Sequence, residues 1–313
     1  MSAEESSDNR MNQSFYDELL KILPEEQVKV NEPMRGHTTF RVGGPADYFV
    51  MPGTKEEVAA VLRCCREQGV PYYIIGNGSN LLVSDEGYRG VIIQIFKSMN
   101  KVECEGHTIT AQAGALLSVV AGRALKEHLT GFEFAAGIPG TLGGACVMNA
   151  GAYGGEMKDV LKSVTVLTSE GKLLTLQRHE LELGYRTSII AKKNYIVLEA
   201  ALDLEKGDQE AIRSRMEELG EKRSAKQPLE YPSAGSTFKR PEGYFAGQLI
   251  QDAGLRGFQV GGAQISEKHC GFVINKGGAA AADIAELMRQ VSARVEETSG
   301  VRLEAEVKRL GEF

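Results

Sequence analysis

Hydrophobic and polar positions follow two periods along this chain, one typical of helices and one of strands. Residues 14–30 carry a helical pattern that Pro24 interrupts. Thr54 and Glu57 form a capping pair that predicts a helix ending at Gly69. The pattern also predicts helices over 116–128, 208–224, 244–253 and 281–298, a β-rich stretch over 35–51, and strands over 72–75, 90–95, 108–113, 162–168, 172–176, 195–204, 258–265, 271–275 and 301–309.

These elements predict more than one domain. The chain has 313 residues, which is more than one ordinary hydrophobic core accommodates. A polar break at 205–210 separates the strand 195–204 from the helix 208–224. Beyond it, helices and strands alternate to the end of the chain, so the last hundred residues predict a compact α/β unit.

Composition and charge are those of a soluble globular protein. Charged residues make up 25% of the chain and the net charge is -6, which argues against a general nucleic-acid or membrane surface while leaving room for a local cationic pocket. No apolar run reaches the roughly 18 residues of a membrane helix. The first ten residues, MSAEESSDNR, lack the features of a signal peptide. We therefore expect a frayed N-terminal tail and a cytoplasmic location.

Cysteines and histidines give no sign of a disulfide framework or a metal site. The five cysteines form no C-x-x-C pair, which is typical of reduced cytosolic thiols, and Cys64 and Cys65 lie together in a helical pattern as packing residues. The five histidines are far apart in sequence. We expect no bound metal.

A first glycine segment, Gly76-Asn77-Gly78-Ser79-Asn80, follows the strand 72–75 directly. Its glycines allow backbone N–H groups to face an anion, and Asn and Ser add donors. A dinucleotide fingerprint needs a third glycine where Leu81 stands, and Leu81 to Val83 continue as strand. A plain turn and a phosphate nest explain this segment equally well.

A second glycine segment, GIPGTLGGACVMNAGAYGG, covers residues 137–155. Its other side chains are mostly small or apolar, so it is not a flexible linker. A buried loop of this kind lets backbone approach a flat, polar ligand closely, and a flavin ring and pyrophosphate fit. Tight helix–sheet packing is the alternative; it accounts for Gly143 and Gly144 but not for Asn149 and Tyr153. Together the two segments favour a nucleotide-sized ligand.

Eight further stretches are specific enough to indicate a family. They are HTTFRVGGPADYFV (37–50), IIGNGSNLL (74–82), GIPGTLGGACVMNAGAYGGE (137–156), YRTS (185–188), YPSAGSTFKRP (231–241), AGQLI (246–250), GGAQIS (261–266) and LEAEV (303–307). In order and spacing they resemble the UDP-N-acetylenolpyruvoylglucosamine reductase family, also called UDP-N-acetylmuramate dehydrogenases. The resemblance covers nearly the whole chain from about residue 30.

The resemblance implies an α+β fold: a two-part FAD-binding fold of the vanillyl-alcohol-oxidase type followed by a C-terminal α/β substrate domain. The implied division is a tail and helix over 1–34, FAD subdomains over 35–96 and 97–206, and a substrate domain over 207–313. It also implies an NADPH-dependent flavoenzyme that reduces the enolpyruvyl group of a UDP-sugar to UDP-N-acetylmuramate, in peptidoglycan precursor synthesis for the cell wall. We expect a monomer or weak oligomer.

Some members of this family carry a tyrosine-bearing loop that folds over the substrate. In this chain Pro241 is followed almost at once by the helix predicted over 244–253, which leaves no room for the insertion. The chain therefore resembles the shorter type.

Three residues match the family's catalytic pattern. Reduction of an enolpyruvyl double bond delivers a hydride to one carbon while negative charge builds at the other, so a charge stabiliser and an acid are needed. The resemblance implies Arg186 as the stabiliser and Ser236 as the proton donor. It implies that Glu306 assists at the same carbon. Period-2 alternation would place Glu304 on the same strand face, and only the motif chooses Glu306.

The remaining site residues carry over from the same motifs. The residues implied to bind FAD are Gly76, Asn77, Gly78, Ser79, Asn80, Gly137, Ile138, Pro139, Gly140, Gly144, Asn149, Gly151, Ala152 and Tyr185. The residues expected to bind the UDP-sugar are Lys226, Arg240, Arg256 and His269. Their cationic and polar groups suit a diphosphate in an otherwise acidic protein.

Two other functions fit parts of this pattern. An oxidoreductase of the same fold with another substrate, with flavin attached covalently, would need a reactive side chain such as His37 or Cys146, and no motif marks either residue. A catalytically silent flavin- or nucleotide-binding protein is disfavoured because all three catalytic residues are present.

Overall fold

The computed structural model describes residues 12–313, so the predicted frayed tail lies outside the described residues. The chain forms two compact units. The first contains the residues up to Glu32, Asp47–Gly76 and Gly90–Gly220, and the second contains Pro33–Ala46, Asn77–Arg89 and Glu221–Phe313. Each unit thus collects segments from distant parts of the sequence. The predicted division at residues 96 and 206 is contiguous instead, and it stays a prediction.

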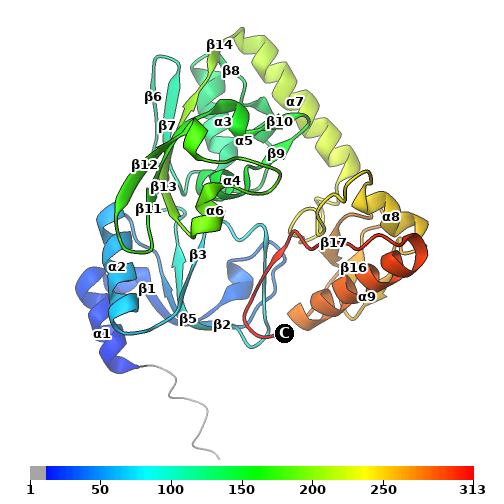
Figure 1. The fold of residues 1–313 in the computed structure, drawn as a ribbon, viewed down its shortest axis with the longest axis horizontal. Coiled ribbons are helices and arrows are strands. Elements are labelled where there is room, and N and C mark those ends of the chain that lie inside the picture. Colours follow the sequence, from blue (N-terminus) through cyan, green and yellow to red (C-terminus); the bar gives the residue numbers. More distant parts are fainter. Residues whose placement is uncertain (1–11) are drawn as a thin grey trace, which may run out of the picture. The chain divides into compact units, whose positions relative to one another are not determined.

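A five-stranded antiparallel sheet is the framework of the first unit (Figure 1). Its strands, in spatial order, are β12 (Leu173–Gln177), β11 (Leu161–Leu167), β13 (Ile196–Asp203), β7 (Thr108–Gln112) and β6 (Val102–Glu105). Helices α3 (Leu117–Lys126) and α4 (Leu142–Met148) pack on this sheet. The alternating burial of Val164 and Val166 on β11 places their side chains in the shared core, as expected for a sheet covered on one face.

A second sheet holds the N-terminal elements. Its order is β1 (Val28–Pro33), β2 (Pro45–Val50), β5 (Tyr88–Gln94) and β3 (Tyr72–Ile75), and β3 runs parallel to β5. Helices α1 (Gln13–Ile22) and α2 (Lys55–Glu67) contact each other and bury Phe15, Leu19 and Val58 in the same core.

Short elements complete the first unit. They are β8 (Leu129–Thr130) paired with β14 (Glu205–Lys206), β9 (Gly151–Ala152) paired with β10 (Gly155–Glu156), α5 (Met157–Val160) and α6 (Ile189–Lys193). Helix α7 (Gln209–Lys226) begins in the first unit and ends in the second.

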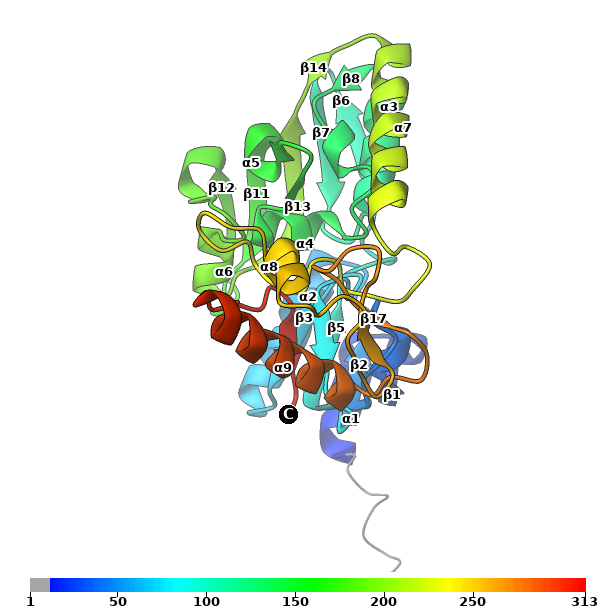
Figure 2. The same ribbon diagram turned by 90° about the vertical axis from the view of Figure 1, so that its right-hand side faces the viewer.

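The second unit is built on a small antiparallel sheet and one long helix. Strands β15 (Gln259–Val260), β16 (Ala263–Ile265) and β17 (Val273–Asn275) form the sheet, and α9 (Ala281–Ser299) lies beside β17 (Figure 2). Helix α8 (Ala246–Asp252) packs on α9. Strand β4 (Leu81–Val83) pairs in parallel with the final strand β18 (Lys308–Leu310).

Most predicted elements are present, and four predictions about them were wrong. The interruption predicted at Pro24 is present, since α1 ends at Ile22, and proline lacks the backbone donor that a helix interior needs. The helical pattern extended to residue 30 was wrong, because β1 begins at Val28. The strand predicted over 258–265 is two strands joined by a turn at Gly261 and Gly262.

The other two differences concern the glycine-rich and C-terminal segments. The stretch 137–155, interpreted as a loop, contains the helix α4, which Thr141 caps by accepting from Gly144 N–H. The strand predicted over 301–309 is regular only over 308–310, because the preceding residues pair with Phe238 through a single bridge at Ala305.

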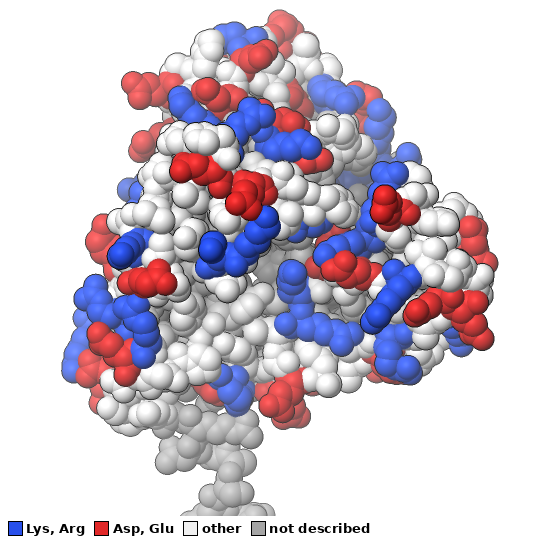
Figure 3. Space-filling view, in the orientation of Figure 1, with Lys and Arg blue, Asp and Glu red and all other residues white. Residues whose placement is uncertain are grey.

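The surface carries both signs of charge. Acidic and basic side chains are interspersed over the face shown in Figure 3, in keeping with a modest net charge of -6. Within residues 12–313, no helix is both long and apolar enough to cross a bilayer. The same residues contain no group of three or more His, Cys, Asp or Glu side chains placed to hold a metal ion.

The β4 segment is connected to α9 by an unusual cap. The Asp85 carboxylate accepts hydrogen bonds from Ala281 N–H at 2.8 Å and Ala282 N–H at 2.9 Å, although about 200 residues separate them. A carboxylate at this end satisfies free backbone donors and opposes the helix dipole. The contact explains why residues 77–89 belong to the same unit as the C-terminal hundred residues.

We expect Asp85→Ala to lower the free energy of unfolding by about 1–2 kcal/mol, because two donors of α9 lose their acceptor. Urea unfolding measured by circular dichroism checks this. Asp252→Ala is the matched control, since Asp252 is exposed and bonds only a neighbouring side chain on its own helix, Gln248. A change in Asp85→Ala no larger than that of the control would contradict the role of the cap.

Candidate active site

The first glycine segment meets the second inside the first unit. A Cβ atom at Gly76 would lie 2.3 Å from Thr141 Oγ1, so only glycine fits there. Gln94 Nε2 donates to the Gly76 carbonyl at 3.2 Å and holds the end of β3 in place. Thr141 in turn caps α4. The end of β3 and the start of α4 therefore form one packed junction.

Backbone is exposed around this junction. Gly137, Pro139 and Gly144 are exposed, whereas Leu142 and Gly143 are buried. A Cβ atom at Gly143 would lie 2.9 Å from Ala113 Cβ, so helix–sheet packing accounts for this glycine. Packing does not account for Gly144, whose missing Cβ faces only Thr141 Oγ1 at 3.6 Å. A backbone surface with few side chains, supported by buried residues, fits a flat cofactor such as FAD.

The hairpin β9–β10 continues the second segment. Gly151 pairs with Glu156, and a Cβ atom at Gly151 would lie 2.6 Å from the Gly155 carbonyl oxygen. Ala152 is half-buried, and Tyr153, at φ 53°, is exposed at the turn. These small residues allow the tight hairpin, which accounts for part of the glycine content without a ligand.

Asn149 ends α4 in the left-handed conformation, at φ 45°. Its side chain is buried, and both the nitrogen and the oxygen of its amide form hydrogen bonds to protein groups. Nδ2 donates to Glu156 Oε2 at 2.8 Å and to the Gly184 carbonyl at 3.0 Å, and Oδ1 accepts from Lys158 N–H at 2.8 Å. The side chain is therefore engaged by the protein, and its predicted contact with FAD stays a prediction.

Arg186 lies in a tight turn of the first unit. The turn closes through two backbone hydrogen bonds between Gly184 and Thr187, and Arg186 has φ 54°. Tyr185 is exposed beside it, and the guanidinium carbon lies 5.4 Å from the centre of the Tyr185 ring. The turn thus presents an aromatic ring and a permanent cation next to each other.

The rest of the first segment belongs to the second unit. Gly78 has φ 63°, and a Cβ atom there would lie 2.0 Å from the His37 carbonyl oxygen. Asn80 Nδ2 donates to the Glu306 carbonyl at 3.1 Å, and the Asn80 carbonyl accepts from Lys308 N–H at 3.0 Å. Asn77 and Ser79 are half-buried between these two points. The predicted cofactor residue Asn80 and the predicted catalytic residue Glu306 are therefore neighbours.

Ser236 and Glu306 come together through Thr237. Glu306 N–H donates to the Thr237 carbonyl at 2.8 Å. Thr237 N–H donates to the Gly271 carbonyl, and its buried Oγ1 accepts from Val273 N–H, both at 2.9 Å. Ser236, next to this buried residue, is exposed. The proton donor and the carboxylate predicted from distant motifs thus lie on adjacent backbone segments.

The expectation that Glu304 and Glu306 share a strand face was wrong. The Glu304 side chain is 72% exposed and forms an ion pair with Lys239, whereas Glu306 is buried. The cause is the irregular backbone over 301–306, where period-2 alternation does not hold. The difference in burial distinguishes Glu306 from Glu304, as the motif does. The catalytic role of Glu306 stays a prediction.

The residues expected to bind the UDP-sugar also belong to the second unit. Lys226 ends α7, and its charge acts on His269, so these two lie near each other. Arg240 Nε donates to the Tyr244 carbonyl at 3.3 Å, and its guanidinium stacks 4.0 Å from the Phe245 ring centre. The Arg256 guanidinium donates hydrogen bonds to the Glu267 carbonyl and to the Gln251 side chain.

His269 is positioned for a neutral role. Its Nδ1 accepts from Gly271 N–H at 3.1 Å, and its ring meets Phe272 edge to face. Burial lowers the pKa of His269, and the charge of Lys226 lowers it further. A neutral imidazole accepts on one nitrogen while the other donates, so a donor remains for a ligand.

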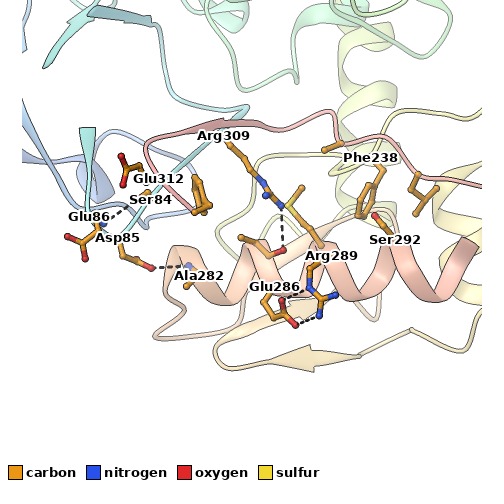
Figure 4. Close-up of a pocket in the computed structure, with 15 residues that line it drawn as sticks. Ser84, Asp85, Glu86, Phe238, Ala282, Glu286, Arg289, Ser292, Arg309 and Glu312 are labelled. Atoms are coloured by element: carbon orange, nitrogen blue, oxygen red, sulfur yellow. Dashed lines mark hydrogen bonds and ion pairs between the residues drawn. The ribbon is translucent and has the colours of Figure 1, made fainter. Parts of the chain in front are cut away.

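A separate cavity of about 730 Å³ lies between α9 and the C-terminal strand, and none of the predicted site residues line it. Figure 4 shows its polar side chains engaged with protein: Arg289 pairs with Glu286, Arg309 contacts the Ala285 carbonyl, and Asp85 points to the first turn of α9. The cavity therefore adds nothing to the candidate site.

Two contributors were missed from the sequence. Thr237 and Ser188 support the site through hydrogen bonds between their hydroxyls and backbone groups. Thr237 follows Ser236 directly in AGSTF, and Ser188 lies two residues after Arg186 in YRTS. A small polar residue within two positions of a predicted catalytic one is the only signal that could have identified them.

Comparisons with known proteins identify the family of this chain. Residues 46–177 match the family described as "FAD binding domain", and residues 227–310 match "UDP-N-acetylenolpyruvoylglucosamine reductase, C-terminal domain". The chain is 56% identical over 306 residues to UDP-N-acetylenolpyruvoylglucosamine reductase of Lachnoclostridium phytofermentans, which covers 96% of this chain and 99% of the relative. The corresponding enzyme of Clostridioides difficile is 54% identical over 301 residues, covering 96% and 99%.

A solved structure shows the same fold. The crystal structure of UDP-N-acetylenolpyruvylglucosamine reductase from Thermus caldophilus superposes with a TM-score of 0.79 and 37% identity, covering 91% of this chain and 100% of that one. The class is thus an FAD-binding oxidoreductase with a domain of the vanillyl-alcohol-oxidase type and a separate C-terminal domain, as predicted.

The chain belongs to the UDP-N-acetylenolpyruvoylglucosamine reductase family. The predicted function, reduction in peptidoglycan precursor synthesis with FAD as cofactor and NADPH as reductant, is confirmed. Membership decides against an oxidoreductase with an unrelated substrate and against a silent binding protein.

The lowered pKa of His269 has a consequence for stability. A histidine that resists protonation in the folded state favours folding above its unfolded pKa of about 6.5, and this contribution is lost as pH falls toward the folded value. We expect His269→Gln to gain stability relative to the unsubstituted protein as pH falls from about 7.5 to 5.5.

Urea unfolding at both pH values measures this difference. His179→Gln, at an exposed position of the first unit, is the control. The interpretation fails if the stability difference between His269→Gln and the unsubstituted protein is the same at both pH values.

Proposed function

We propose that Arg186, Ser236 and Glu306 carry out the reduction of the enolpyruvyl group within this family's reaction. The observation that supports the proposal most strongly is the junction in which Asn80 and Thr237 both bond the Glu306 backbone. It places an exposed hydroxyl and a buried carboxylate beside a segment expected to bind FAD.

FAD would be held by Gly76, Gly78 and the exposed backbone around Gly137, Pro139 and Gly144. The side chains of Asn77, Ser79 and Asn80 would add donors. When bound, it supplies the hydride for one carbon of the double bond. The other contacts predicted from the sequence are Ile138, Gly140, Gly151, Ala152 and Tyr185. Asn149 is also among the sequence-predicted contacts, but protein groups engage both ends of its side-chain amide. The protein contributes backbone donors and a rigid platform, which suits a pyrophosphate and a ring system.

Arg186 would bind the substrate carboxylate next to the carbon where charge develops. Its planar guanidinium stays charged at any physiological pH and offers paired donors to carboxylate oxygens. The backbone of Arg186 is strained, at φ 54°. Such strain is typical of functional residues whose side chain must point in one direction.

Ser236 would donate the proton to that carbon. A serine hydroxyl is a weak acid, so it needs a strongly basic acceptor and a hydrogen bond already directed toward it. Glu306, largely withdrawn from water, would assist charge and proton handling at the same carbon. Solvent would reprotonate Ser236 after the reaction, because the residue is exposed.

Lys226, Arg240, Arg256 and His269 would bind the diphosphate and sugar. We also propose that the chain is the shorter family type: Pro241 and the start of α8 at Ala246 are five residues apart, and an extra loop has no place between them. A cytoplasmic monomer or weak oligomer, with domains divided at 34, 96 and 206, completes the proposal.

The purified protein tests the activity itself. It should be yellow, lose its flavin absorbance when NADPH is added without oxygen, and regain it on addition of the UDP-enolpyruvyl sugar. Recovery with oxygen but not with this sugar would indicate a different substrate. A colourless protein that takes up no FAD would contradict every flavin-based function.

Ser236→Ala separates proton delivery from hydride supply. We expect flavin reduction by NADPH to keep its rate, whereas reoxidation by the UDP-sugar slows by about 100-fold or more, because a positioned acid is lost. Anaerobic stopped-flow absorbance measures both steps. Ser214→Ala, an exposed serine on α7, is the control. Normal reoxidation in Ser236→Ala would remove the proton-donor assignment.

A further inference from the structure

We propose that Asn149 is a positioning residue that directs Arg186, and that it does so through the backbone of the turn that carries the arginine. The inference rests on the role proposed above for Arg186. It assigns to Asn149 a function different from the FAD contact expected from sequence.

The side chain of Asn149 joins three segments. It is only 1% exposed, and both of its amide hydrogens and its oxygen are bonded to protein. One hydrogen goes to the Gly184 carbonyl, the residue that opens the turn around Arg186. The other goes to Glu156, and the oxygen receives Lys158 N–H. Glu156 and Lys158 therefore fix the side-chain amide, and the fixed amide holds the turn at the Gly184 carbonyl.

A second contact ties the same turn to the same helix end. Ser188 Oγ, fully buried, donates to the Val147 carbonyl at 2.7 Å. The turn is thus attached at Gly184 by Asn149 and at Ser188 by Val147, with Arg186 midway between. Two fixed ends and the mutual bonds of Gly184 and Thr187 leave the Arg186 backbone little freedom.

Helix α4 connects this clamp to the predicted cofactor surface. The helix has 7 residues and begins after Thr141, which packs on Gly76, and ends at Asn149. A short helix of this kind is a stiff spacer about 10 Å long. Within the first unit, α4 therefore fixes Arg186 relative to Gly76 and to the second glycine segment, both of which are expected to hold FAD.

The left-handed backbone of Asn149 allows a clean test. Glycine adopts this conformation without strain, so Asn149→Gly removes the amide while keeping the helix end. Asn194 supplies the matched control, because it ends α6 in the same conformation, at φ 52°, with an exposed side chain. The pair Asn149→Gly and Asn194→Gly therefore differs in the clamp and not in the backbone requirement.

The experiment compares four proteins: unsubstituted, Asn149→Gly, Asn194→Gly and Arg186→Ala. For Asn149→Gly we expect unchanged FAD content and affinity, an unchanged rate of flavin reduction by NADPH, and reoxidation by the UDP-enolpyruvyl sugar slowed by about 10- to 100-fold. Hydrogen–deuterium exchange of the peptide over 182–190 should rise as well. Asn194→Gly should match the unsubstituted protein in FAD affinity and in both half-reactions.

Each other outcome has a definite meaning. Loss of FAD affinity in Asn149→Gly with normal reoxidation of the remaining holoenzyme would overturn the inference and support a direct cofactor contact. Normal reoxidation and exchange in Asn149→Gly, with slow reoxidation in Arg186→Ala, would overturn the inference alone. Normal reoxidation in Arg186→Ala would instead overturn the proposed role of Arg186.

Asn149→Asp keeps the test decisive if the glycine variant fails to fold. Aspartate is nearly isosteric and tolerates the left-handed conformation. Its second oxygen would face the Gly184 carbonyl and the Glu156 carboxylate and repel both. The same separation of half-reactions is expected, and its absence would overturn the proposal.

Discussion

Thr237 makes the contacts on which the candidate catalytic group of the second unit depends. Its three polar groups bond two segments: the N–H and Oγ1 bond the backbone of Gly271 and Val273, and the carbonyl accepts from Glu306 N–H. Because Thr237 is fully buried, no water competes for these bonds, and an unpaired group would be costly. The constraint leaves Ser236 exposed at the edge of a rigid junction, next to the irregular segment that carries Glu306.

A comparable arrangement supports the first unit. There a glycine, Gly76, permits contact with Thr141, and a buried asparagine at the other end of α4 holds the turn of Arg186. In both units the groups proposed to act on the substrate stand in turns or at strand ends, while buried neighbours supply the rigidity. Preorganisation of this kind lets weak groups such as a serine hydroxyl act, since the geometry is set before the reaction.

Local signals predicted the regular elements well. Thr54 accepts from Glu57 N–H as its pattern indicates, β3 occupies residues 72–75, and α9 covers the predicted helix 281–298 with one further residue. Each depends on neighbours within a few positions. The motifs also identified the family, which the comparisons confirm.

Features that depend on distant contacts were not predictable. Helix α4 was interpreted as loop because its glycines lower helix propensity, and tertiary packing of Gly143 on Ala113 outweighs that penalty. The contrasting burial of Glu304 and Glu306 follows from pairing with 237–239, more than sixty residues away. Periodicity within one segment contains no information on such pairings.

A crystal structure of the oxidised holoenzyme with the UDP-enolpyruvyl sugar tests the central claim most directly. The account predicts the Arg186 guanidinium at the substrate carboxylate, with the Ser236 hydroxyl and the Glu306 carboxylate both beside the carbon that receives the proton. A complex in which the enolpyruvyl group lies against the flavin but contacts none of these three side chains would contradict it.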